Sequence, residues 1–64
     1  MTTIKISARA KFLVRNIVLG NVTYLEVMAS KAVKDSEEAG ETPTLAEQID
    51  AYIEQQGLNI DKTV

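Results

Sequence analysis

The chain contains no cysteine and no histidine, and only one proline and three glycines interrupt its 64 residues. The missing thiolates and imidazoles exclude disulfide bridges and the usual transition-metal sites. They also reduce the available general bases and nucleophiles to carboxylates, lysine, tyrosine and hydroxyls, which need a buried pocket to shift their pKa values. A domain this small has little room for such a buried pocket. We therefore expect no enzymatic activity, no cofactor, no metal and no small-molecule substrate.

Long apolar runs are also absent. No stretch approaches the roughly 20 residues that span a bilayer, and residues 1–5 lack the charged-then-apolar layout of a secretion signal. We expect a soluble, cytoplasmic protein without a membrane partner. Residues 1–64 form one domain at most, and a domain of this size buries only about 60% of the surface that its unfolded chain exposes. Because no disulfide or metal can stabilise so small a core, we expect a homodimer.

Charge is unevenly distributed along the chain, whose net charge is −2. Residues 1–25 carry four cations and no acid, whereas residues 26–64 carry three cations and nine acids. This asymmetry indicates an N-terminal half that faces an anion, although a solvated surface accounts for it equally well.

Apolar and polar residues alternate from position 3 to position 15, with Leu13 as the exception. A strand sends alternate side chains to opposite faces, so this period predicts one apolar and one cationic face. Gly20-Asn21 then separates the run from a second β-rich run, as in a two-residue hairpin turn. We predict an α+β fold with an N-terminal β-hairpin over about 3–19 and 22–33.

The same segment also fits two helices. Ser7 can cap a first helix, and Thr23 with Glu26 has the form of a capping box for a second. That alternative fills the helices with β-branched residues and leaves Phe12 and Leu19 on the polar side of the first one. The hairpin is therefore preferred, while the choice between hairpin and two helices stays open for the middle of the chain.

After the predicted hairpin the sequence indicates an acidic linker, at about 34–43, and one amphipathic helix, at about 44–56. Thr44 and Glu47 form a capping box at the start of this helix, and Gly57 ends it. The alternating tail beyond Gly57 can add a short C-terminal strand. We expect contact with a second copy through strand edges or through the apolar stripe of the helix, which consists of Leu45, Ile49, Tyr52 and Ile53.

The cationic face of the predicted hairpin is the candidate binding site. Lysine and arginine along a strand can follow phosphates, and an aromatic ring beside them can stack on a base. We predict a small non-enzymatic protein that binds an anionic partner, with nucleic acid favoured. The alternative is a protein-interaction module or inhibitor, of the kind that mobile elements encode, which docks on an acidic protein surface and is anchored by Phe12 or Tyr24. The predicted contact residues are Lys5, Arg9, Lys11, Arg15 and Tyr24.

Two short motifs resemble ribbon-helix-helix repressors. Residues 3–7 (TIKIS) with Arg9 are similar to the N-terminal strand of that family, and residues 20–23 (GNVT) resemble the turn before its second helix. The interval between Arg9 and Gly20 looks too short for the family's first helix, and the helix at 44–56 lies beyond its usual end. The resemblance implies a dimeric DNA-binding repressor as a further alternative. The residues that would reach into the major groove are Thr3, Lys5, Ser7 and Arg9.

Overall fold

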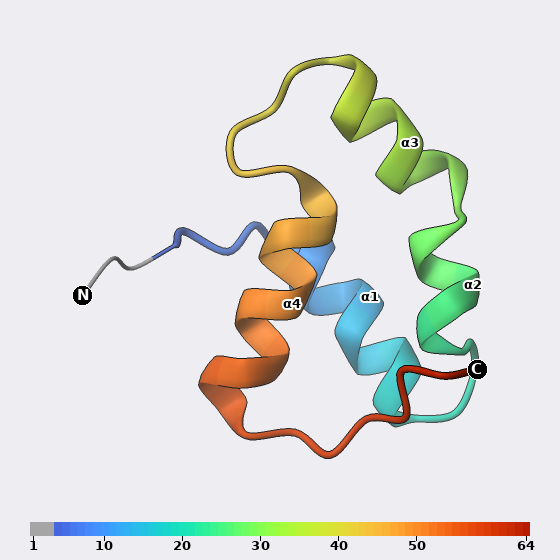
Figure 1. Cartoon of the computed structure of the whole chain (residues 1–64). Helices are drawn as coiled ribbons and strands as arrows, with labels where there is room; N and C mark the ends of the chain where they lie inside the picture. Colours follow the sequence, from blue (N-terminus) through green and yellow to red (C-terminus); the bar gives the residue numbers. More distant parts are fainter. Residues whose placement is uncertain (1–3) are drawn as a thin grey trace.

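The computed structural model describes residues 4–64, and all the regular structure in that range is helical (Figure 1). Helices α1 and α4 make the most extensive contact between elements. The segment after α4 returns to the start of α2, where the Leu25 N–H donates to the main-chain oxygen of Val64 at 2.7 Å. The helices are α1 (Ala8–Val18), α2 (Tyr24–Met28), α3 (Lys31–Glu38) and α4 (Leu45–Gln56).

The predicted α+β class is wrong, because residues 4–64 contain no strand. The hairpin over 3–19 and 22–33 is replaced by α1, α2 and the start of α3, with residue 3 outside the described range. The expected C-terminal strand is likewise irregular backbone. The acidic linker is shorter than predicted, since its first half lies in α3.

Helix α1 forms because its N-terminus is capped and because some of its apolar residues also recur at helical spacing. The backbone of Ser7 is extended, and its hydroxyl accepts a hydrogen bond from the Ala10 N–H at 3.3 Å. Ala10 and Val14, four residues apart, are buried on the inner face. Leu13, which interrupted the alternation, is partly buried against the same core. The helical alternative for this segment, which was ranked below the hairpin, is therefore the observed structure.

A serine joins α2 to α3. Thr23 and Glu26 form the capping box of α2, with the Thr23 N–H donating to the Glu26 carboxylate at 2.8 Å. The Ser30 hydroxyl donates to the Val27 carbonyl at 2.6 Å and also accepts from the Val33 N–H, so one side chain ends α2 and begins α3. These caps satisfy backbone groups that helix ends leave unpaired.

The prediction of the last helix is confirmed. Thr44 and Glu47 form the predicted capping box, and Gly57 ends α4 in the left-handed conformation at φ 62°. The first turn of α4 is also held by a buried residue of α3, because the Leu45 N–H donates to the Ser36 hydroxyl at 2.8 Å. Ser36 is only 1% exposed.

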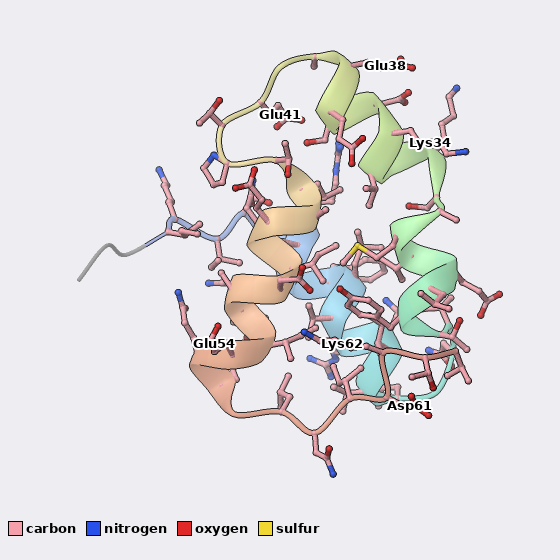
Figure 2. All side chains as sticks on the ribbon, viewed as in Figure 1. Lys34, Glu38, Glu41, Glu54, Asp61 and Lys62 are labelled. Carbon is pink, nitrogen blue, oxygen red and sulfur yellow. The ribbon has the colours of Figure 1, made fainter. Side chains whose placement is uncertain are left out.

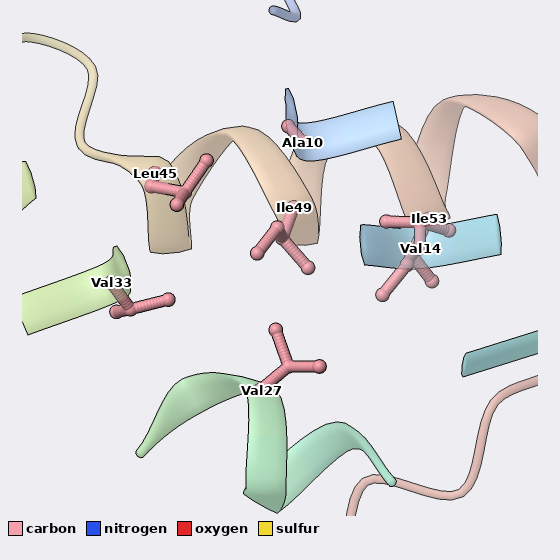
Figure 3. Packing of buried hydrophobic residues seen from close by; sticks show 7 residues of the cluster. All are labelled: Ala10, Val14, Val27, Val33, Leu45, Ile49 and Ile53. Carbon is pink, nitrogen blue, oxygen red and sulfur yellow. The ribbon is translucent and has the colours of Figure 1, made fainter. Parts of the chain in front are cut away.

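All four helices contribute to one small core (Figure 3). The stripe of α4 predicted to contact a second copy supplies three of its members, so Leu45, Ile49 and Ile53 are covered within the chain and only Tyr52 stays half-buried. No helix in the described part of the chain is long and apolar enough to cross a membrane. The buried apolar residues are Ala10, Val14, Val27, Val33, Leu45, Ile49 and Ile53.

Candidate docking surface

The structure separates the five residues predicted to contact an anionic partner. Only Lys11 and Arg15 lie on one side of one helix, one turn apart on α1. Lys5 and Arg9 each line a hollow that Glu41 also lines. Tyr24 is on α2 and lines a different hollow, under the C-terminal segment. The cationic strand face therefore does not exist. Of its three members on α1, only Lys11 and Arg15 share one side of the helix.

That helix surface combines cations with large exposed apolar side chains. At 100° per residue, the five residues between positions 11 and 19 that form this surface span an arc of about 120° around the helix axis. Phe12, Leu19 and Val18 are 64%, 62% and 56% exposed, which is high for apolar residues of their size. We call this surface the α1 face, and it consists of Lys11, Phe12, Arg15, Val18 and Leu19.

A groove of about 600 Å³ runs between the α1 face and the C-terminal end of α4. Val14 lies at its inner side, where α1 enters the core. Tyr52 and Gln56 line it from α4, and Leu58 lines it from the segment after α4. The α1 face thus continues into a concave apolar surface, which a projecting side chain of a partner can fill.

Both cations of the α1 face are available to a partner. Helix α1 contains no acidic residue. Within residues 4–64 the ion pair found is that of Lys62 with Asp50, on the other side of α4. Lys11 and Arg15 are exposed, so their charges face solvent.

Tyr24 makes interactions within the fold. Its hydroxyl donates to Oδ1 of Asp50 at 2.5 Å, and Nζ of Lys62 lies 3.6 Å from the same oxygen and 5.4 Å from the centre of the Tyr24 ring. Figure 2 shows Lys62 reaching back from the C-terminal segment. Burial, together with the hydrogen bond to Asp50 and its negative charge, raises the pKa of Tyr24 to about 12. This cluster ties α2, α4 and the C-terminal segment together.

Sequence reasoning identified Lys11, Arg15 and, as an anchor, Phe12, but missed Val18 and Leu19. The signal was present: a helix over this segment leaves Phe12 and Leu19 on its polar side. These two exposed apolar side chains are part of the candidate surface.

Comparison with protein-family models, with curated proteins and with solved structures found no match to this chain. No group of three or more His, Cys, Asp or Glu side chains suited to a metal ion occurs among residues 4–64.

Proposed function

We propose that this chain is a small non-enzymatic docking protein that binds an acidic partner protein through the α1 face. The observation that carries the proposal is the concentration of apolar surface on one helix. Five large apolar side chains are exposed in the described part of the chain, and three of them, Phe12, Val18 and Leu19, lie on the α1 face. Interface centres are enriched in aromatic residues and arginine, and Phe12 lies one turn from Arg15.

The same surface favours a protein partner over nucleic acid. Nucleic-acid affinity comes mainly from many cations that neutralise phosphates. The α1 face offers two cations among three large apolar side chains. Lys5 and Arg9 line other hollows, to which Glu41 also contributes. Tyr24, which we expected to stack on a base, is engaged with Asp50. Apolar contact with a protein makes better use of Phe12 and its neighbours.

The experiment is affinity capture from the source organism's lysate with three versions of the protein. The wild type and Leu25→Asp, a matched control at an exposed apolar residue of α2, should capture the same protein. Phe12→Asp should lose it, and so should the charge-reversed pair Lys11→Glu and Arg15→Glu. Circular dichroism of each variant verifies the fold. Capture that is unaffected by the α1 variants would refute the proposal.

Nucleic acid is tested in parallel by fluorescence anisotropy with short single- and double-stranded DNA over a salt series. Tight binding that weakens steeply with salt and is lost on Lys5→Glu or Arg9→Glu would replace this proposal with the nucleic-acid one. It would also favour the ribbon-helix-helix alternative, whose contact residues include Lys5 and Arg9; Thr3, another of them, is outside the described residues.

Self-association and cellular location stay predictions. A homodimer has to use surface other than Leu45, Ile49 and Ile53, because these side chains are in the core. Sedimentation equilibrium at micromolar concentration tests the homodimer, and fractionation of the source cells tests the cytoplasmic location.

A further inference from the structure

We infer that the partner segment is an acidic amphipathic helix that lies along α1 in the groove between α1 and α4. This inference rests on the proposed function and specifies its ligand. It follows from the spacing of the α1 face, from the recognition modes that the fold permits and from the charge of the surface.

The α1 face has the spacing of a helix-packing surface. Its exposed members recur at steps of three and four residues, which form the ridges that interdigitate with those of a second helix. The 11 residues of α1 extend over about 16 Å, so a partner helix of about three turns covers the face. Phe12 and Leu19, seven residues apart, are exposed on the same side of the helix with Arg15 between them, and the groove beside them receives the partner's own apolar residues.

The fold offers no good site for the other common modes of peptide recognition. Addition of a strand requires a free sheet edge, and residues 4–64 contain no sheet. Proline-rich ligands dock in grooves lined with aromatic rings, whereas this groove is mainly aliphatic and has two rings, Phe12 and Tyr52. Among strand addition, proline-rich docking and helix docking, a helix seated in the groove is the mode that fits an apolar surface of this shape.

The charges of the surface specify an acidic helix. Lys11 and Arg15 are four residues apart, which places them about 6 Å apart along the axis on one side of α1. Two carboxylates four residues apart on a partner helix have the same spacing. Because α1 has no acid of its own, nothing on the helix opposes them. A basic helix would instead face two uncompensated cations.

The test is an unbiased selection of random peptides of about 16 residues, enough for about four helical turns. The peptides are displayed and selected on the immobilised full chain, with Phe12→Asp protein for counter-selection and Leu25→Asp as the matched control. We expect enriched peptides with apolar residues at helical spacing and acids four residues apart. They should gain helical circular dichroism on binding. Their affinity should fall at least about tenfold on the double reversal Lys11→Glu/Arg15→Glu.

A charge swap gives the sharpest result. Changing the two peptide acids to lysine should abolish binding to the wild type and restore it on the doubly reversed protein, since each pair regains opposite signs. Enriched peptides that depend on Phe12 but are extended, or carry no acids, would overturn the helix inference and leave the proposed function in place. Failure to enrich any peptide that depends on Phe12 would overturn the inference. The proposed function is decided separately by lysate capture: it is supported if Phe12→Asp loses the captured protein and refuted if capture is unaffected.

A second copy of the chain is the remaining occupant of this face, and sedimentation distinguishes it. Self-association that Phe12→Asp abolishes would overturn the inference, because a second copy then occupies the α1 face. A wild-type monomer that binds the selected peptides in a one-to-one complex supports it.

Discussion

Replacing Ser36 by alanine should lower the free energy of unfolding more than the same replacement of an exposed neighbour on α3. The Ser36 side chain is 1% exposed and its hydroxyl accepts the Leu45 N–H at 2.8 Å, at the first residue of α4. Alanine removes the acceptor and leaves that N–H buried without a partner. Such a loss costs about 1–3 kcal/mol. Removing an exposed helix cap such as Thr44, which accepts from the Glu47 N–H, costs about 1 kcal/mol by comparison.

This cost is large for a chain of 64 residues, whose free energy of unfolding is expected to be about 3–10 kcal/mol. For a domain of this size, 1 kcal/mol corresponds to a Tm shift of about 4–8 °C. The Tm of Ser36→Ala should therefore fall by roughly 4–24 °C.

The assay is urea unfolding followed by far-UV circular dichroism, with Glu37→Ala as the matched control on the exposed side of α3. The control should stay within about 0.5 kcal/mol of the wild type. The midpoint of Ser36→Ala should decrease with an unchanged m-value, since the surface exposed on unfolding is the same. A Ser36→Ala protein as stable as Glu37→Ala would refute the packing of α3 against the start of α4.

Three further predictions concern the core, the Tyr24 cluster and the C-terminal segment. Ile49→Ala should lower the free energy of unfolding, measured with urea, by about 2–5 kcal/mol because Ile49 is fully buried. Phe12→Ser, at an exposed position, should lower it by less than about 0.5 kcal/mol. Equal losses would contradict the placement of α1. Because folding raises the pKa of Tyr24 from 10.0 to about 12, its contribution to stability is complete below pH 10 and is lost as the pH rises toward 12. Tyr24→Phe should lack this decrease when the free energy of unfolding is measured across that range. A Tyr24→Phe protein with the same pH profile as the wild type would show that Tyr24 does not make this contribution. Lys62→Ala should lower the free energy of unfolding by no more than about 1 kcal/mol, since Lys62 and Asp50 are about half exposed. Hydrogen exchange of the Leu25 amide should nevertheless become faster as the C-terminal segment loosens. Unchanged exchange would show that the ion pair does not hold the segment.

Local signals were sufficient for α4. A capping box at Thr44 and Glu47, an apolar stripe and a terminal glycine all lie within the helix or next to it, and each acts through neighbouring backbone groups. The same kinds of signal were present for α1 and α2, at Ser7 and at the Thr23–Glu26 box, but they were outweighed by the two-residue alternation.

The alternation misled because a period of two contains steps of four. Ala10 and Val14 lie on one side of a strand and equally on one side of a helix. The two structures differ in where they place the neighbouring residues: a strand would bury Phe12 with Ala10 and Val14, whereas in the helix Leu13 packs against the core and Phe12 is exposed. That difference depends on α4 lying beside α1, which no local pattern contains.

The sequence by itself determined which chemical groups and local signals this protein has: no thiol or imidazole, a cationic N-terminal half, and helix ends marked by capping residues. Tertiary structure alone decided which of these residues share a surface. Packing of α1 against α4 buries Val14 and leaves Phe12, Val18 and Leu19 outside beside Lys11 and Arg15. Capping acts over three or four residues and can be read locally, whereas burial depends on segments more than thirty residues apart, such as Ser7 and Gln48, whose hydrogen bond joins the start of α1 to α4.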